Sequence, residues 1–314
     1  MSDASAVREV RVPRPIQRCG VCYHPDVVGA GDLAARLRDQ IEAAGVQVWL
    51  AALARDSDGP EGDSAVAEQL PGSDLLVCVG GDGTVLQASG LAAPLEVPVF
   101  GVRMGRLGFL AEATETDAPD ALRLILGGGG RIEERSMALA TTGEAGGGEQ
   151  LHALNDVVIG RHRLGRTVSV GLQVDGVLLA EYRADAVVVA TATGSTGYSL
   201  AISGPILYPT SPELIVAAVA PHLSYANAMV IRGDTVVTLQ MARGHEAVMT
   251  VDGHHEREVP DGTVVRVSRS PRIARFVRLG GEEQFYANLA RRLGWLRLDH
   301  QLDEVRDEVA ERES

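Results

Sequence analysis

Short apolar segments and amphipathic segments alternate along the first 135 residues of the chain. Segments with continuous apolar residues predict strands, and segments with apolar residues at helical spacing predict helices. The predicted strands are residues 19–23, 46–53, 73–81 and 97–102, and the predicted helices are residues 32–45, 84–93 and 117–129. This alternation favours an α/β domain with a mostly parallel sheet.

From about residue 136 the pattern changes to short β-branched segments separated by turns. An Asp-Gly pair at 175–176 lies between two alternating segments and predicts a β-hairpin. Further strands are predicted at residues 185–193, 213–220, 228–231, 235–241, 247–253 and 263–269. This half is typical of an antiparallel β-sandwich. Helical spacing returns at residues 282–295, and a charged tail follows.

These patterns divide the chain into an α/β domain at residues 1–136, an all-β sandwich at residues 137–281 and a C-terminal helix with a charged tail at residues 282–314. A length of 314 residues agrees with two domains, because it exceeds what one ordinary core accommodates. We assign no function to the charged tail.

Charge and hydropathy narrow the classes of partner. The formal net charge is −13, which argues against a nucleic acid partner. The chain contains no lysine, so any local basic site must use arginine, and a P-loop lysine is excluded. No segment approaches the roughly 18 apolar residues of a membrane helix, and the N-terminus lacks a signal-peptide core. We expect a cytoplasmic protein without a membrane partner.

The three cysteines do not form a disulfide framework, because their number is small and odd. Cys19 and Cys22 form a C-x-x-C pattern, which is compatible with a redox motif or half of a zinc site. However, a strand would turn the two side chains to opposite faces, and no second C-x-x-C completes a zinc site. We therefore favour a structural role, and we predict no metal-ligating residues.

A glycine-rich stretch, GGDGT at residues 80–84, follows the apolar strand 73–81. A glycine turn between a strand and a helix can direct backbone N–H groups at a phosphate. The stretch is neither a Rossmann fingerprint, since Leu86 replaces the third glycine, nor a Walker A motif. A tight turn in which Asp82 caps its own helix is an equally good interpretation of these residues alone.

Two more stretches carry candidate chemistry. Residues 191–205 contain almost no bulky side chain, so a ligand can approach the backbone closely. The short hydrogen-bonding side chains in this loop are Thr193, Ser195, Thr196 and Ser199. Asn155 and Asp156 interrupt an apolar strand, where they can bind a ribose or form only a turn.

In this order and at these spacings, the three stretches resemble the NAD kinases. The resemblance extends through GRLGFLAE at 105–112, VAPHLS at 219–224, VDG at 251–253 and FYANLARRLGW at 285–295, and so covers most of the chain. It implies transfer of the γ-phosphoryl group of ATP, or in some members of polyphosphate, to the adenosine ribose 2′-hydroxyl of NAD. It also implies Mg²⁺ or another divalent cation, a homodimer or homotetramer, and a C-terminal segment that packs back on the first domain.

By position, the resemblance makes Asp82 the general base and places Gly83 against phosphate. The remaining residues that it assigns to nucleotide binding are Gly80, Gly81, Thr84, Asn155, Asp156, Arg166, Arg183, Asp185, Thr193, Ser195, Thr196, Gly197, Tyr198, Ser199, Leu200, Ala201 and His254. His254 occupies a place where glutamine is common in the family.

Three residues depart from the family pattern. Arg103 replaces an asparagine, Gly197 replaces an alanine, and Ser203 replaces the first glycine of a Gly-Gly-Pro sequence. None of these changes removes an acid or a phosphate-binding group, although Arg103 can alter donor preference.

Two rival functions remain open from the sequence. A lipid kinase also carries GGDGT, but this chain offers no basic or amphipathic membrane surface. A catalytically idle NAD-binding module would have no need of the acid in GGDGT.

Overall fold

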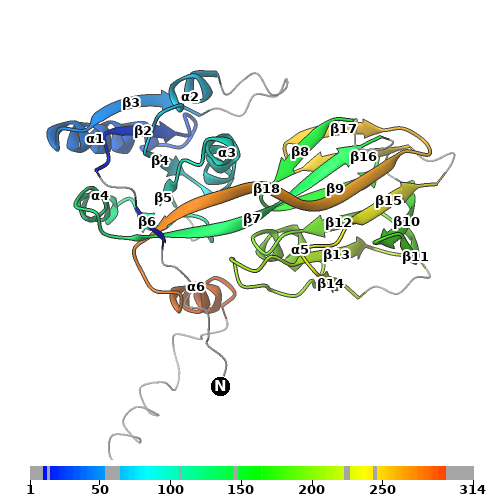
Figure 1. Cartoon of the computed structure of the whole chain (residues 1–314). Helices are drawn as coiled ribbons and strands as arrows, with labels where there is room; N and C mark the ends of the chain where they lie inside the picture. Colours follow the sequence, from blue (N-terminus) through cyan, green and yellow to red (C-terminus); the bar gives the residue numbers. More distant parts are fainter. Residues whose placement is uncertain are drawn as a thin grey trace, which may run out of the picture.

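The structure is a computed structural model that describes residues 10–12, 15–53, 64–105, 108–143, 148–163, 165–222, 227–242 and 246–294. The charged tail predicted after residue 295 lies outside these residues. The described chain folds into two halves with an additional C-terminal helix, α6 (Gln284–Arg292) (Figure 1).

The first half is an α/β domain built on parallel strands in the order β3-β2-β4-β5. Its strands are β2 (Arg18–Tyr23), β3 (Gln47–Ala52), β4 (Leu75–Gly80), β5 (Val99–Arg103) and the short β6 (Ala113–Thr114). Its helices are α1 (Ala30–Ala43), α2 (Ser64–Gln69), α3 (Asp82–Ala92) with the 3-10 turn η1 (Ala93–Leu95), and α4 (Ala118–Leu126). The predicted α/β domain with a mostly parallel sheet is confirmed.

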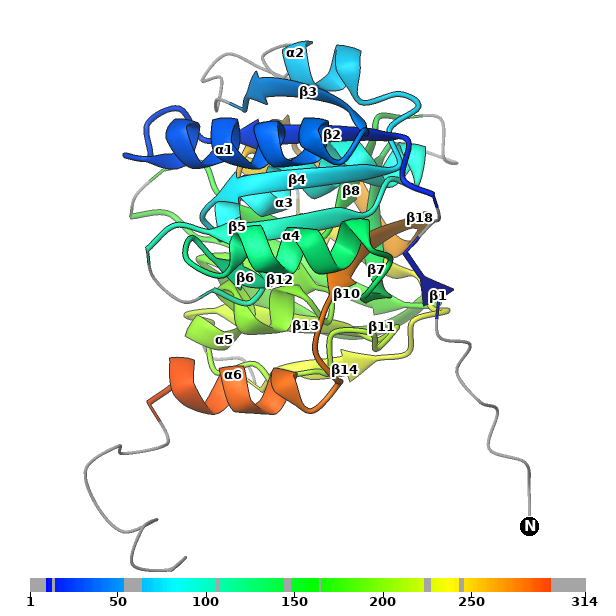
Figure 2. The ribbon, with the colours of Figure 1, turned by 90° about the vertical axis from the view of Figure 1, so that its left-hand side faces the viewer.

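Both faces of this sheet are covered. Helices α1 and α4 pack on one face, with Cys19 in their core, and α2 and α3 pack on the other face, with Cys22 and Cys78 in theirs (Figure 2). The two residues of the C-x-x-C pattern therefore do point to opposite faces of β2. All three cysteines are buried and unbridged, which agrees with a structural role.

The second half consists of mostly antiparallel strands in two packed layers. Its strands are β7 (Arg131–Thr142), β8 (Gln150–Ala153), β9 (Asp156–Arg161), β10 (Val168–Val174), β11 (Val177–Ala184), β12 (Ala186–Ala190), β13 (Leu214–Val219), β14 (Met229–Ile231), β15 (Val237–Met241), β16 (Ala247–Val251), β17 (His255–Val259) and β18 (Val264–Arg278). One layer has the order β14-β13-β12-β9-β16-β17. Its inward side chains pack against β7, β10, β15 and β18 in one apolar core.

The predicted hairpin at Asp175–Gly176 is confirmed, because Val174 pairs with Val177 across it. Both turn residues have positive φ, as a two-residue hairpin turn of this kind requires. The loop after β12 contains the 3-10 turn η3 (Gly194–Thr196) and the helical turn α5 (Tyr198–Ala201).

One long strand joins the two halves. β18 pairs with β15 and β7 in the second half, and its Phe276 pairs in parallel with Val99 of β5 in the first half. The register between β18 and β7 shifts between Arg269 and Ile273, where Pro271 cannot donate a ladder hydrogen bond. The division expected at residue 136 lies inside β7, and the exact domain bounds stay a prediction.

The short strand β1 (Val10–Arg11) pairs with β7, so residues 10–11 lie beside the strand that leaves the first half. Among the described helices, none combines the length and apolar character that crossing a membrane would require.

Candidate active site

A cavity of about 190 Å³ lies where the two halves meet. We call it the junction cavity. Its described lining consists of Asp82, Gly83, Leu86, Phe109, Leu110, Asn155, Thr193, Thr196, Gly197 and Arg292. Residues from GGDGT, from the Asn155 turn and from the small-residue loop therefore meet in one place, although they lie far apart in the sequence.

Asp82 occupies the first turn of α3, yet its side chain does not cap that helix. Gly81 is the N-cap residue, and within the described residues no side chain forms a cap hydrogen bond at this helix start. The Asp82 carboxylate instead accepts the backbone N–H groups of Phe109 at 2.7 Å and Leu110 at 3.3 Å. The interpretation of Asp82 as a cap for its own helix is therefore wrong.

The segment that holds Asp82 approaches it closely. A Cβ atom at Gly108 would overlap the Asp82 carboxylate, so only glycine fits at that position. Two backbone donors and a residue without a side chain thus fix the carboxylate, which is about one-third exposed, at the wall of the junction cavity.

Arg292 of α6 faces the same carboxylate. Its guanidinium lies 3.4 Å from an Asp82 oxygen and 4.3 Å from the centre of the Phe109 ring. The helix is attached to the second half by Tyr208, whose ring packs edge-on against Phe285. The C-terminal helix therefore contributes a positive charge to a cavity whose other walls come from both halves.

The rest of GGDGT has a supporting position. Gly83 lines the junction cavity, whereas Thr84 is buried beneath the turn and only 4% exposed. Gly80 ends β4, and Gly81 has an extended backbone before the helix. Backbone N–H groups at the start of α3 consequently lie next to the cavity, where a helix N-terminus favours anions.

Asp252 holds the Asn155–Asp156 turn in place. Its carboxylate accepts three successive backbone N–H groups, from Leu154 at 2.8 Å, Asn155 at 2.7 Å and Asp156 at 3.2 Å. Asn155 then lines the junction cavity. The Asp-Gly pair at 252–253 is a turn signal that could have pointed to Asp252, and in the structure this aspartate has a positive φ of 53°.

Asp156 is buried next to this turn and only 7% exposed. Burial, and secondarily the charge of Asp252, raises the pKa of Asp156 to about 7. Its carboxyl group therefore changes protonation near neutral pH, beside the residue that lines the cavity.

The small-residue loop is fastened to the same turn. The Thr191 N–H donates to the Asn155 carbonyl at 2.8 Å, and the Thr191 hydroxyl donates to the Leu154 carbonyl. A Cβ atom at Gly194 would overlap the Asn155 carbonyl group, so the loop can lie this close only with glycine there. The loop and the turn form one wall of the junction cavity.

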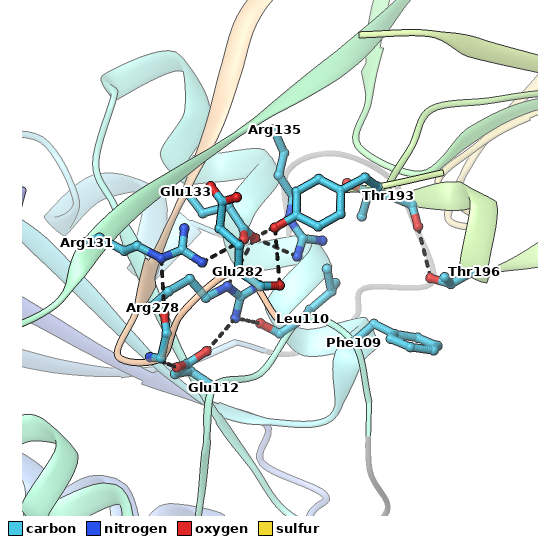
Figure 3. Close-up of polar contacts among 12 residues, drawn as sticks. Phe109, Leu110, Glu112, Arg131, Glu133, Arg135, Thr193, Thr196, Arg278 and Glu282 are labelled. Carbon is cyan, nitrogen blue, oxygen red and sulfur yellow. Dashed lines mark hydrogen bonds and ion pairs between the residues drawn. The ribbon is translucent and has the colours of Figure 1, made fainter. Parts of the chain in front are cut away.

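Thr193 provides a polar group on that wall that has no protein partner. Its residue is 5% exposed, and its hydroxyl oxygen makes no hydrogen bond within the described part of the chain. Thr196 lies beside it and donates to the Thr193 carbonyl at 3.2 Å (Figure 3). A buried hydroxyl without a partner at a cavity wall indicates a place for a polar ligand.

Other residues of the loop support its shape. The Ser195 hydroxyl donates to the Ala192 carbonyl at 2.6 Å and accepts the Leu207 N–H at 3.1 Å, so it is engaged inside the loop. Tyr198, Ser199, Leu200 and Ala201 form α5 and are not among the described lining of the cavity. Ser203 has a positive φ of 63°, a conformation that suits the glycine it replaces.

Four predicted site residues lie elsewhere. Asp185 pairs with Arg161 at 2.8 Å, and Arg183 donates to the Thr167 hydroxyl at 3.2 Å, next to Arg166 in the chain. Asp185 precedes β12, whereas the small-residue loop begins at Thr191, at the other end of that strand. The two ends are about 20 Å apart along an extended chain, so Asp185 is distant from the loop. His254 is exposed in the Asp252–Gly253 turn, with its Nδ1 2.8 Å from the Asp252 carbonyl oxygen. None of these four is among the described residues lining the junction cavity.

Of the other departures from the family pattern, Gly197 lines the cavity, and Arg103 at the end of β5 donates to the Gly105 carbonyl at 3.2 Å.

A buried ion cluster lies behind the cavity (Figure 3). Glu133 of β7 accepts hydrogen bonds from Arg135 at 2.8 and 2.9 Å and from Arg278 of β18 at 3.1 Å. Burial alone would raise the pKa of Glu133, but Arg278 and Arg135 together lower it to about 2. The cluster therefore stays charged at neutral pH.

This cluster reaches the segment that holds Asp82. Arg278 donates to the Leu110 carbonyl at 2.9 Å and pairs with Glu112 at 3.2 Å, while the Leu110 N–H faces Asp82. Sequence patterns did not identify these residues, because charged side chains in a strand normally indicate a solvent-facing side. Only the packing of β7 against β18 and the segment 108–112 shows that they are buried.

The site contains no preformed metal centre among the described residues, since no three His, Cys, Asp or Glu side chains are grouped there. Asp82 is the one carboxylate among the described residues lining the junction cavity.

Comparisons with known proteins identify the family of the chain. Residues 20–130 match the family model for the ATP-NAD kinase N-terminal domain, and residues 154–279 match the model for the ATP-NAD kinase C-terminal domain. The NAD kinase of Chloroflexus aurantiacus (strain J-10-fl) is 39% identical over 279 residues, which cover 88% of this chain and 99% of the relative. The NAD kinase of Dehalococcoides mccartyi (strain BAV1) is 33% identical over 279 residues, which cover 88% and 96%.

Two solved structures share the fold. Yeast NADH kinase complexed with NADH superimposes with a TM-score of 0.76 at 20% identity, and the match covers 92% of this chain and 90% of that one. An NAD kinase from Archaeoglobus fulgidus in complex with ATP gives a TM-score of 0.68 at 24% identity, covering 86% and 96%. At these identities the two structures are similar in fold alone.

Proposed function

Because this chain belongs to the ATP-NAD kinase family, we propose that it is a phosphotransferase that converts NAD to NADP. The γ-phosphoryl group of ATP is transferred to the 2′-hydroxyl of the adenosine ribose of NAD, and ADP leaves. The observation that carries the proposal is the junction cavity, whose described lining brings Asp82 of GGDGT together with Asn155 and Thr193.

Asp82 is the proposed general base. The ribose oxygen forms a bond to the γ-phosphorus while the bond from that phosphorus to the β,γ-bridging oxygen breaks, and the hydroxyl proton passes to the Asp82 carboxylate. Two backbone N–H groups bind the carboxylate at 2.7 and 3.3 Å and so fix its direction. Such positioning is the main contribution that a protein makes to phosphoryl transfer.

The remaining assignments follow the resemblance to the family, and the lining of the junction cavity supports those for Gly83, Asn155, Thr193, Thr196 and Gly197. Gly83 at the start of α3 is proposed to lie against phosphate, and Gly80, Gly81 and Thr84 shape that turn. Asn155 and Asp156 are proposed to hold NAD, with Thr193, Ser195 and residues 196–201 on the adenosine side. The unpartnered Thr193 hydroxyl supports this placement.

Arg166, Arg183, Asp185 and His254 are proposed to contact the dinucleotide outside the junction cavity. Cytoplasmic location and a homodimeric or homotetrameric assembly also stay predictions from the resemblance and the composition, as does the lack of a nucleic acid or membrane partner.

A divalent cation, Mg²⁺ or another, fits the donor set of this site only as a companion of the nucleotide. Asp82 is the single carboxylate of the described lining, and Mg²⁺ commonly binds one or two carboxylates together with substrate phosphates. When bound, the cation would offset the charge of the triphosphate. We assign no protein residue as its dedicated ligand.

A panel of donors and acceptors on the purified protein tests the function. ATP with Mg²⁺ and NAD should form NADP, and parallel reactions with polyphosphate and with NADH define the donor and acceptor range. Phosphorylation of diacylglycerol or a long-chain base without NADP formation would contradict the proposal in favour of a lipid kinase. NAD binding in calorimetry without turnover on any donor would indicate an idle binding module.

A further inference from the structure

The only described cation in the lining of the junction cavity is Arg292, and the only described anion is Asp82. The contact between them is weak by the standards of ion pairs. The two groups are 3.4 Å apart, through one oxygen, and about one-third of each side chain is exposed. Strong pairs between arginine and carboxylate are bidentate at 2.7–2.9 Å, so this contact can exchange for a better one at low cost.

Each partner is held by other contacts. Asp82 accepts its shorter hydrogen bond from the Phe109 N–H at 2.7 Å, so its direction does not depend on Arg292. The Arg292 guanidinium lies over the Phe109 ring at 4.3 Å, which keeps it at the cavity without Asp82. The Tyr208 hydroxyl also bonds to the Glu282 carbonyl at 3.3 Å, which fastens the start of α6.

The proposed reaction needs a positive charge at this place. Negative charge is spread over the oxygens of the phosphoryl group in flight, and arginine has a planar set of donors that matches phosphate oxygens. The chain has no lysine to take this role. Arg135 and Arg278 are not available either, because both are buried and bonded to Glu133.

We propose that Arg292 binds the γ-phosphoryl group of ATP during transfer. In the free protein it contacts Asp82; when ATP occupies the cavity, its guanidinium moves to the phosphate oxygens, and Asp82 becomes free to accept the hydroxyl proton. This inference rests on the proposed kinase function and adds a residue of the C-terminal helix to that site.

The test compares Arg292→Gln and Arg292→Lys with Arg291→Gln. Arg291 is the preceding residue of α6, is exposed, and bonds to Asn288 at 3.0 Å, so it is a matched control outside the cavity. We expect Arg292→Gln to lower kcat/KM for ATP about a hundredfold, in the range found when one donor to a transition-state oxyanion is removed. Arg291→Gln should retain the wild-type value.

Two readouts separate phosphate binding from a structural role. Arg292→Gln should weaken binding of a non-hydrolysable ATP analogue in calorimetry and leave NAD binding unchanged, and Arg292→Lys should restore part of the loss. Free guanidinium ion should also raise the turnover of Arg292→Gln and have no such effect on Arg291→Gln.

Unchanged analogue binding and turnover in Arg292→Gln would overturn the inference, as would equal losses of ATP-analogue and NAD binding. Failure of the wild-type protein to form NADP is a different result, because it would contradict the proposed function itself. In that case the binding of the ATP analogue to the two glutamine variants still decides whether Arg292 recognises the triphosphate.

Discussion

The Asp82 carboxylate accepts the backbone N–H of Phe109 at 2.7 Å, across 27 residues of sequence. This contact directs an acid of the first half at a cavity whose opposite wall belongs to the second half. The acid of GGDGT is thus positioned by a neighbouring loop and does not serve the helix in which it lies.

Asp82→Asn should lower the rate of NADP formation by about a thousandfold or more, since removal of a general base costs about 10²–10⁴. The amide oxygen can still accept the Phe109 N–H at 2.7 Å, and only the longer bond from the Leu110 N–H is lost, so the fold should stay intact. Steady-state kinetics and circular dichroism measure the two effects. A variant with the wild-type rate would remove Asp82 from the base role.

Asp252→Asn should weaken NAD binding about tenfold and lower the melting temperature. The two carboxylate oxygens of Asp252 accept three backbone N–H groups, whereas the amide of asparagine has only one oxygen to accept them. At least one of these hydrogen bonds is therefore lost, and a hydrogen bond to a charged group contributes about 1.5–3 kcal/mol. Asparagine tolerates the positive φ, so backbone strain is not the cause. Calorimetry with NAD and thermal unfolding measure the result.

The matched control for this prediction is Asp175→Asn. Asp175 is also an Asp-Gly turn residue with positive φ, and its exposed carboxylate accepts one backbone N–H among the described residues, that of Val236 at 2.9 Å. NAD binding should be unchanged in this variant. Equal effects of the two substitutions would show that Asp252 does not support the NAD site specifically.

Asp156 should make stability depend on pH between about 4 and 7. Its pKa is raised from 3.8 to about 7 by burial and then by Asp252, so the folded protein binds this proton more tightly than the unfolded chain. The resulting stabilisation is complete below pH 3.8 and is lost as the pH rises through about 7.

Melting temperatures of the wild type and Asp156→Asn across this pH range test that sign. The side chain at position 156 of the variant cannot ionise. The melting temperature of the variant minus that of the wild type should therefore increase as the pH rises from 4 to 8. Parallel profiles would contradict the raised pKa of Asp156.

Ser203→Gly should stabilise the protein by about 1 kcal/mol. Ser203 has φ of 63°, and a left-handed conformation costs an ordinary residue about 1–2 kcal/mol, part of which the greater freedom of glycine in the unfolded chain offsets. Denaturant unfolding measures the change. A loss of stability would mean that the Ser203 side chain makes a compensating contact.

Glu133→Gln should destabilise the fold by about 3–5 kcal/mol, because it leaves the buried guanidinium group of Arg135 without its hydrogen-bonded counter-charge and leaves Arg278 with Glu112 alone. Its sequence neighbour Glu134 pairs with Arg275 at 3.0 Å near the surface, so Glu134→Gln should cost no more than about 1 kcal/mol. Urea unfolding of both variants compares them directly. Similar losses would show that the cluster behind the cavity adds no special stability.

The convergence of GGDGT, Asn155 and the small-residue loop was predicted through the resemblance to the NAD kinases, because no strand pattern in one half shows which segment of the other half it faces. The helices could be predicted from the residues alone, since α1 and α4 each carry one regular apolar face.

The remainder depends on contacts between distant segments. Asp252 lies 96–98 residues from the turn that it holds, and no local pattern connects them. Strand β7 was not predicted because charged residues occupy four of its first five positions. Two of those, Glu133 and Arg135, are buried, bonded to each other and packed against Arg278 and Phe276 of β18. The role of the Asp82 side chain could not be decided from the sequence either, because its hydrogen-bond partner Phe109 lies 27 residues away.

Strand β18 also limits how this protein can be divided or recombined. Its 15 residues belong to one sheet that continues from the second half into the first, and β7 accompanies it along most of that length. A chimera of two relatives that is joined near residue 136 would have its junction inside β7. The first part of β7 would then come from one relative and its pairing partner β18 from the other. An exchange of the two halves between relatives therefore requires that β7 and β18 both come from the same relative.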